Sequence, residues 1–201
     1  MVDARFKLLP APPADLDAVR DAQRAVPLVP GDEDDCCARL QQRCGYETRD
    51  VARTWLTFLR ALELAVETDA GFKRLPAEPD PDHLRDAFLR RVSLAPEALR
   101  ALVDAADAGE APLDAGAVFE RVRDAVPTYE EYKNPAEWTD IWRDRTADLL
   151  GWLALLDLVE RVDGVDDGAG DGAADPGDES DRDLAYRPTE RGRAALAAVG
   201  S

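Results

Sequence analysis

The sequence predicts a mainly α-helical protein with small β-hairpins, an α+β fold made of two successive copies of one unit. Each half of the chain has a long amphipathic helix, over residues 48–64 and 138–156, that runs directly into a strand pattern. The apolar positions of these two helices also match when the halves are aligned. In both halves, a helical period of apolar residues changes abruptly to strand periodicity. This recurrence indicates that a unit of helix and hairpin is duplicated.

The helix over residues 48–64 has the clearest pattern of the first copy. At about 100° per residue, five apolar side chains fall on one side and are predicted to face the core: Val51, Trp55, Phe58, Leu59 and Leu62. Four polar side chains fall on the opposite side: Arg49, Arg53, Thr57 and Arg60. The preceding Thr48 can accept a hydrogen bond from a free N–H of the first turn. The outward face of this helix is therefore expected to be cationic.

A shorter helix and a hairpin flank this long helix. The shorter helix is predicted over residues 32–42, and the hairpin over 65–75 has a turn at Gly71. Helix, turn, cationic helix and hairpin is the element order of a winged helix-turn-helix, a fold that commonly lays its second helix in a DNA groove. Lys73 and Arg74 lie on the hairpin, which is the wing of such a fold.

The second half repeats this element order. Asp114 and Thr189 are predicted to cap helices over 115–126 and 190–199. At an offset of 94, Trp55, Leu56, Phe58, Leu59, Leu62 and Leu64 align with Leu149, Leu150, Trp152, Leu153, Leu156 and Leu158. The expected organisation is an arm over 1–13, a first winged-helix unit over 14–75, a linker and connecting helix over 76–94, and a second unit over 95–199. An irregular α-rich single domain is the alternative.

A short motif supports a named resemblance. Thr189-Glu190-Arg191-Gly192, directly after Tyr186-Arg187-Pro188, resembles the T-x-x-G exit that follows the wing in many archaeal and bacterial regulators. Each half resembles a winged-helix domain, and the pair resembles the tandem winged-helix proteins of haloarchaea. The resemblance covers about residues 14–75 and 95–199, and it implies fold more strongly than function, because one fold serves many functions.

The composition is strongly acidic. The 201 residues include 28 Asp and 14 Glu against 22 Arg and 3 Lys, for a net charge of −17. Asp-rich, Lys-poor sequences resemble those of extreme halophiles; the alternative is a mesophile with high Arg usage and an acidic tail. No apolar run reaches the roughly 18 residues needed to span a bilayer, and no secretory signal is visible. We therefore expect a cytoplasmic protein without membrane association.

Two features depart from the resemblance. Residues 163–183 interrupt the second wing. This segment contains nine acidic residues and one basic residue, and it is expected to be a disordered loop. The second long helix has apolar side chains on one face and an acidic, small-residue strip on the other, which would repel phosphates and admit a close protein partner. The residues predicted for a protein partner, or for a second copy in a homodimer, are Asp140, Asp144, Ala147, Asp148 and Gly151.

These patterns predict a DNA-binding regulator of transcription or chromosome organisation. Arg49, Arg53, Thr57 and Arg60 are predicted to face the groove or its phosphates, and Lys73 and Arg74 to touch the backbone from the wing. The alternative is a non-enzymatic adaptor built from tandem winged helices, with the arginines solvated and stabilised by carboxylates such as Asp50 and Glu63.

No catalytic, metal-binding or cofactor-binding residues are predicted, and no enzymatic activity is expected. Cys36, Cys37 and Cys44 form no Cys-x-x-Cys pair, so they are expected to be small apolar residues rather than zinc ligands. Since Cys36 and Cys37 are adjacent, only one of them is expected to face the core. His83 is expected to be a surface or capping residue. The acidic segment lacks the glutamate that closes a calcium-binding loop.

We predict that the acidic segment contributes almost nothing to folding. Its few apolar residues cannot offset the entropy lost on ordering 21 residues. Replacing residues 163–183 by a short glycine turn should leave the melting temperature nearly unchanged in calorimetry. A large drop in melting temperature would mean that the segment packs against the fold or binds an ion.

Overall fold

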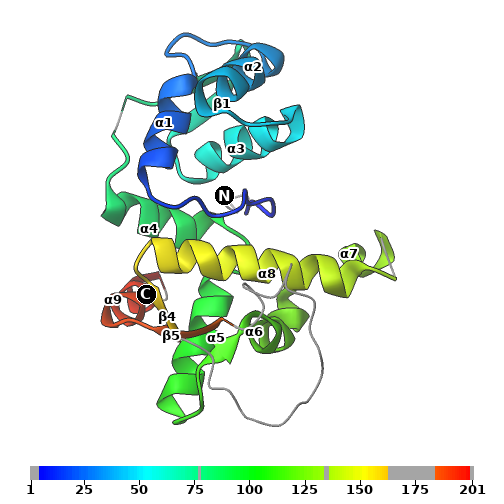
Figure 1. The fold of residues 1–201 in the computed structure, drawn as a ribbon, viewed down its shortest axis with the longest axis vertical. Helices are drawn as coiled ribbons and strands as arrows, with labels where there is room; N and C mark the ends of the chain where they lie inside the picture. Colours follow the sequence, from blue (N-terminus) through cyan, green and yellow to red (C-terminus); the bar gives the residue numbers. More distant parts are fainter. Residues whose placement is uncertain (1–4, 77, 134–135, 163–183, 200–201) are drawn as a thin grey trace, which may run out of the picture. The chain divides into compact units, whose positions relative to one another are not determined.

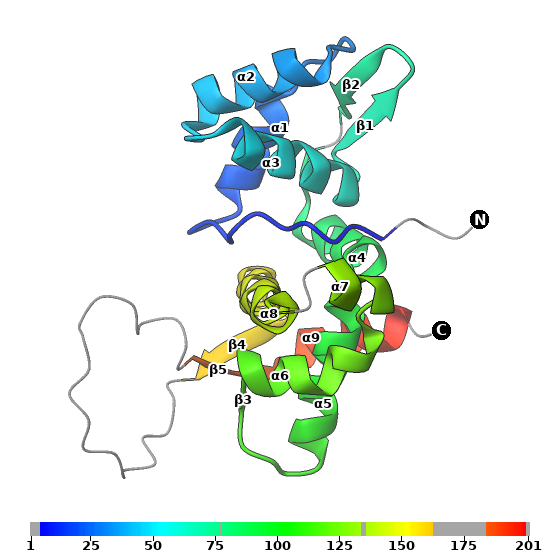
Figure 2. The same ribbon diagram turned by 90° about the vertical axis from the view of Figure 1, so that its right-hand side faces the viewer.

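In the computed structural model, the first half of the chain folds as three helices, a hairpin and one further helix (Figures 1 and 2). The structure describes residues 5–76, 78–133, 136–162 and 184–199, so the acidic segment lies outside the described residues. The chain divides into two units, residues 1–95 and 96–200. The elements of the first unit are α1 (Asp17–Ala25), α2 (Glu33–Cys44), α3 (Arg49–Ala61), β1 (Ala65–Thr68), β2 (Gly71–Arg74) and α4 (Pro81–Arg91).

The second unit has the same order with additions. Its elements are α5 (Ala95–Asp107), β3 (Leu113–Asp114), α6 (Ala115–Val122), the 3-10 turn η1 (Arg123–Ala125), α7 (Thr128–Lys133), α8 (Trp138–Leu155), β4 (Val159–Val162), β5 (Ala185–Pro188) and α9 (Glu190–Val199). The short helix α7 and the change from α6 to a 3-10 turn were not predicted. Strand β5 pairs antiparallel with both β3 and β4.

The core of the first unit is built on the apolar side of α3. Trp55, Phe58, Leu59 and Leu62 are buried, as predicted. The Trp55 ring stacks on Tyr46 with centroids 5.4 Å apart and meets Phe58 edge-on at 6.0 Å. Val51 was wrongly predicted to face this core, because its side chain is 41% exposed. Its neighbour Ala52 is fully buried instead, so the core side of this first turn is centred on Ala52, about 100° round the helix from Val51.

The exit from the long helix is the same in both units. Glu63 and Asp157 each follow the helix C-cap with a left-handed backbone, at φ 58° and 59°. The next residue closes the turn: the Leu64 N–H donates to the Leu59 carbonyl at 2.8 Å, and the Leu158 N–H donates to the Leu153 carbonyl at 2.9 Å. Strands β1 and β4 then start 94 positions apart. The predicted alignment of the two long helices is therefore a structural equivalence.

In both units, arginines of the helix that follows the wing pair with the left-handed residue at the end of the long helix. Glu63 accepts hydrogen bonds from Arg91 Nη1 at 3.0 Å and from Arg90 Nη2 at 3.3 Å. Burial raises the pKa of Glu63, but the hydrogen bonds and charges of the two arginines outweigh it and hold the pKa below its usual value. In the second unit, Arg191 pairs with Asp157. The non-glycine left-handed backbone costs about 1–2 kcal/mol, and these pairs help to offset that cost.

A further extended segment pairs with each wing, as a strand in the second unit and as a single bridge in the first. In the second unit, Leu113 of β3 pairs with Tyr186 of β5. In the first unit, a single bridge joins Gly31 to Phe72 at the corresponding place. The residue after each bridge caps the next helix: the Asp32 carboxylate accepts from the Asp35 N–H, and the Asp114 carboxylate accepts from the Ala117 N–H. Both units thus follow the complete winged-helix pattern, with the strand order preserved.

The N-terminal arm is anchored to the first unit by two backbone hydrogen bonds. The Phe6 N–H donates to the Arg91 carbonyl at 2.7 Å, and the Ser93 N–H donates to the Phe6 carbonyl at 2.9 Å. The Phe6 ring also lies beside the guanidinium groups of Arg60 and Arg91, 5.7 and 5.4 Å from its centroid. The arm therefore belongs to the packing of this unit.

The expectation that only one of the adjacent cysteines faces the core was wrong. Cys36 and Cys37 are both buried, although neighbouring residues of a helix point about 100° apart. The N-terminal half of α2 is covered on two sides, because the loop at Gly31 and the wing residue Phe72 approach Cys36 while α3 covers Cys37. A small side chain fits each of these two sites.

Removing the Trp55 ring should destabilise the fold strongly. Trp55→Ala leaves a large cavity between Tyr46 and Phe58 and should lower the free energy of unfolding by about 3–5 kcal/mol. The matched control is Val51→Ala on the exposed turn of the same helix, which should change it by no more than about 0.5 kcal/mol. Denaturant unfolding of both variants measures the difference, and equal effects would contradict the observed helix orientation.

Candidate nucleic-acid interface

The first turns of α3 form the most exposed part of the predicted DNA-contacting helix. Arg49, Asp50 and Arg53 are exposed there, and the Thr48 hydroxyl caps the helix by accepting from the Val51 N–H at 3.2 Å. Thr57 and Arg60, farther along the helix, are half-buried. The four polar side chains predicted to share one outward face therefore differ in their accessibility.

Arg49 is tied to the start of α2. Its guanidinium pairs with Asp34 and lies 3.4 Å from a carboxylate oxygen of Glu33. Both partners belong to an acidic first turn that also favours the helix dipole of α2. A phosphate that binds Arg49 would have to compete with these two carboxylates. Arg49 is therefore less available to an external anion than its exposure alone suggests.

Arg53 is the accessible cation in the middle of this surface. It is exposed, and within the described residues no ion pair or hydrogen bond of its guanidinium is present. Burial, and next Glu33, raise the pKa of the nearby Cys37 thiol, while Arg49 and Arg53 act in the opposite direction. Arg53 can thus approach an anion without first breaking an internal pair.

Arg60 holds the wing and the N-terminal arm. Its Nη2 atom lies 2.7 Å from Glu67 Oε2 on β1, and its guanidinium lies 5.6 Å from the centroid of Phe72 and 5.7 Å from that of Phe6. Cation–π contacts of this kind stabilise partly buried sites. The prediction that Arg60 faces outward, available to DNA, does not match this placement, because the wing and the arm occupy its guanidinium.

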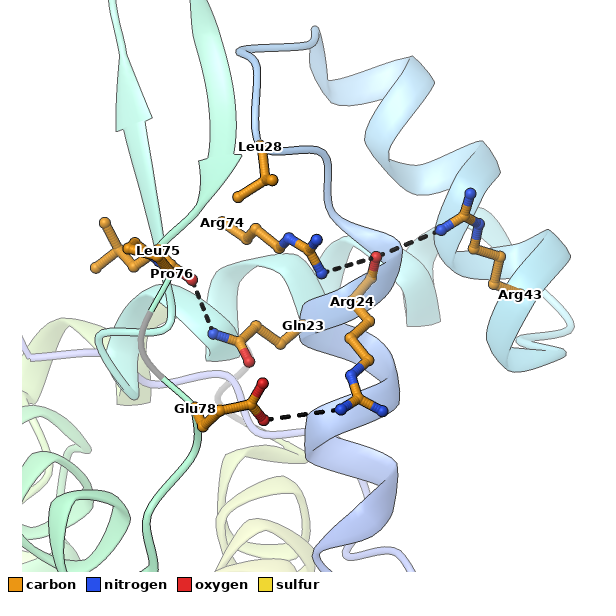
Figure 3. Close-up of a pocket in the computed structure, with 8 residues that line it drawn as sticks. All are labelled: Gln23, Arg24, Leu28, Arg43, Arg74, Leu75, Pro76 and Glu78. Atoms are coloured by element: carbon orange, nitrogen blue, oxygen red, sulfur yellow. Dashed lines mark hydrogen bonds and ion pairs between the residues drawn. The ribbon is translucent and has the colours of Figure 1, made fainter.

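The two cations of the wing lie on opposite faces of β2. Successive residues of a strand alternate in direction, so Lys73 points away from the side that carries Phe72 and Arg74. The Arg74 guanidinium turns toward the helices, where Nη1 donates to the Arg24 carbonyl at 3.4 Å (Figure 3). This placement does not match the prediction that Lys73 and Arg74 touch the DNA backbone together from the wing.

The corresponding surface of the second unit has different chemistry. At the 94-residue offset, Arg49 corresponds to Arg143, but Arg53 and Arg60 correspond to Ala147 and Ala154. Among the residues predicted for a protein partner, Asp140 and Asp144 are exposed, while Ala147 and Asp148 are half-buried. The predicted exposure of Gly151 is wrong, because all residues from 149 to 153 are buried; a glycine, with no side chain, can lie within such a packed stretch.

The most exposed aromatic residues of the second unit were not predicted from the sequence. Tyr129 and Tyr132 lie on α7 with 50% and 79% of their surface exposed. Helix α7 sits between η1 and α8, a connection that is much shorter in the first unit. The signal available in the sequence was this extra length with two tyrosines in it.

The cysteines and His83 lie where structural roles were expected. Burial, and next the neighbouring Cys37, raise the pKa of the Cys36 thiol to about 11, which keeps it protonated. His83 Nε2 lies 2.9 Å from the Leu62 carbonyl, so this ring caps the end of α3. Within the described ranges, no cluster of three His, Cys, Asp or Glu side chains is placed to hold a metal ion, and no helix is long and apolar enough to span a bilayer.

Comparison with known proteins identifies the family. Residues 4–171 match the family described as the halobacterial double winged helix domain. No curated protein and no solved structure matches the chain. The family match confirms the predicted resemblance to tandem winged-helix proteins of haloarchaea and the predicted fold class.

The contacts of Arg60 predict a stabilising role that Arg53 lacks. Arg60→Ala removes the Glu67 pair and two ring contacts, and should lower the free energy of unfolding by about 1–2 kcal/mol. Arg53→Ala removes no described contact and should change it by no more than about 0.5 kcal/mol. Chemical unfolding of the two variants checks this, and an Arg60→Ala variant as stable as the parent chain would contradict it.

Proposed function

Since the chain belongs to the halobacterial double winged helix domain family, we propose that it is a DNA-binding regulator of transcription or chromosome organisation in which the first unit reads DNA. The observation that supports this most directly is the exposed N-terminal part of α3, where Arg53 stands beside Arg49 on a helix that winged-helix folds commonly place in a DNA groove. Winged helices serve other purposes as well, so the charged residues and not the fold support this assignment.

Arg53 supplies the principal contact of this proposed interface. It can donate to a phosphate or to the acceptor edge of a guanine without losing an internal partner. Arg49 adds a second contact after exchanging Asp34 and Glu33 for DNA, and Lys73 reaches the backbone from the outer face of the wing. Arg60 acts indirectly, because it positions the wing relative to α3.

High salt restricts how such a surface can bind. At molar salt, the Debye length is about 3 Å, and counterion release gives little driving force. Attraction over a distance is then lost, and affinity depends on groups in direct contact with DNA. A few well-placed arginines in direct contact with DNA suit this condition better than long-range attraction by a broad basic patch.

The second unit suits a protein partner. Tyr129 and Tyr132 are exposed beside the start of α8, where Asp140 and Asp144 are also exposed. Tyrosines are enriched in protein interfaces because they bury a large area and keep a polar end. The adaptor is therefore the second candidate function. We also propose that the protein is not an enzyme, because no catalytic motif stands in the sequence.

The Arg49→Glu, Arg53→Glu double variant tests the DNA-reading role. Arg60 stays intact because it stabilises the fold. Each lost arginine contact should cost about 1–3 kcal/mol of binding, and the reversed charge should repel phosphates, so genomic occupancy measured by cross-linking in native salt should disappear.

The matched control is Asp140→Ala with Asp144→Ala on the second unit. It should leave genomic occupancy unchanged and reduce the recovery of co-purifying proteins. Full DNA occupancy by the arginine variant would overturn the reading role of the first unit. Loss of partners from the aspartate variant, together with unchanged DNA binding by the arginine variant, would favour the adaptor.

A further inference from the structure

A hollow of about 470 Å³ opens on the first unit, between the C-terminal ends of α1 and α2 and the base of the wing (Figure 3). None of the α3 residues assigned to DNA lines it. Its size falls in the range of sites for small molecules. The lining residues are Gln23, Arg24, Leu28, Arg43, Arg74, Leu75, Pro76 and Glu78.

Two guanidinium groups converge at this hollow on one neutral acceptor. Arg43 Nη1 and Arg74 Nη1 each lie 3.4 Å from the carbonyl oxygen of Arg24 (Figure 3). Both contacts are at the long limit of a hydrogen bond and are therefore weak. Two positive charges held on either side of one oxygen also repel each other. An anion placed between them would relieve this repulsion and accept stronger, charge-assisted hydrogen bonds.

Internal carboxylates do not neutralise this pair. Across the described residues, neither Arg43 nor Arg74 forms an ion pair with Asp or Glu. The carboxylate that lines the hollow, Glu78, lies 3.7 Å from Arg20 and 3.8 Å from Arg24 instead. These long, exposed contacts contribute little. Two neighbouring arginines without a carboxylate partner among the described residues are available to an external anion.

The remaining wall of the hollow is apolar. Leu28 is 57% exposed at its edge, and Leu75 and Pro76 line it beside the Gln23 amide. The Gln23 amide itself donates to the Leu75 carbonyl at 3.0 Å, which fixes this wall against α1. A ligand that satisfies both sides of the hollow needs an oxyanion at one end and an apolar body at the other.

We propose that this hollow binds a small organic anion, a molecule with a phosphate or carboxylate group on an apolar body. Arg43 and Arg74 donate to the oxyanion in place of the Arg24 carbonyl, and Leu28 and Leu75 cover the apolar body. Because Arg74 belongs to β2, a bound anion would also tie the base of the wing to the ends of α1 and α2. This site does not depend on DNA binding by α3.

Titration of the full chain with three probes tests the site. The probes are phenyl phosphate, benzoate and inorganic phosphate, followed by amide NMR shifts in molar salt. Phenyl phosphate or benzoate should saturate the shifts of residues around 23–28, 43 and 74–76, and inorganic phosphate should bind more weakly because it lacks an apolar body. Saturation by phenyl phosphate alone would identify a phosphate site, and saturation by benzoate alone a carboxylate site.

Arg43→Gln and Arg39→Gln form a matched pair of variants on α2. Arg43→Gln removes one charge-assisted donor and should weaken binding of the saturating probe about tenfold or more. Arg39→Gln removes an exposed arginine outside the hollow and should leave that binding unchanged. The proposal is overturned if neither aromatic probe saturates, or if both variants weaken binding equally. It is also overturned if Arg43→Gln lowers DNA affinity while the probes do not bind, since the hollow would then take a DNA phosphate.

Discussion

The turn that leads out of the long helix sets the geometry of each unit. At Glu63 and Asp157 the chain adopts a left-handed conformation that non-glycine residues rarely take, and it does so at the same place in both copies. This turn fixes where the helix stops and which way the first wing strand leaves it. A shift of one residue there would move every side chain of β1 to the opposite face of the wing. The arginines of α4 and α9 hold this turn from outside the helix.

The orientation of α3 follows from that constraint. With Leu62 and Leu64 fixed in the core on either side of the turn, the rotation of the helix about its axis is set at its C-terminal end. Arg60 is then drawn to the wing, and the exposed turns are those at the N-terminal end. A cationic face that looks continuous in sequence is therefore divided into a structural part near the wing and an accessible part around Arg53.

The sequence was sufficient to predict the element order, the helix caps at Thr48, Asp114 and Thr189, and the register between the halves. Periodicity and capping are local properties, which explains that success. Prediction from the sequence failed where the burial of a side chain depends on residues far away along the chain. Val51 is exposed because the buried side of the first turn of α3 is centred on Ala52. Both cysteines are buried because α2 is covered on two sides, and Gly151 is buried within an apparently polar strip. Helix α7 was missed because short helices have little periodicity to detect.

At the candidate site, the sequence correctly placed cations on α3 but could not show their partners. Pairing of Arg49 with Asp34 and of Arg60 with Glu67 requires the three-dimensional arrangement. The same is true of the anion-binding hollow, whose arginines come from three separate elements. In an acidic chain, an arginine is available to an external anion only if no carboxylate of the protein already pairs with its guanidinium. By this criterion, Arg53 and the Arg43–Arg74 pair are available to an external anion, because no carboxylate among the described residues pairs with them.

The most direct test of DNA reading by the first unit is an NMR footprint on the full chain. A duplex selected from a random library for binding in molar salt would be titrated into the labelled protein. The account predicts amide shifts concentrated in residues 48–57 of α3 and near Lys73, with none along α8. Shifts concentrated along α8, or failure of the selection to enrich any duplex, would contradict it.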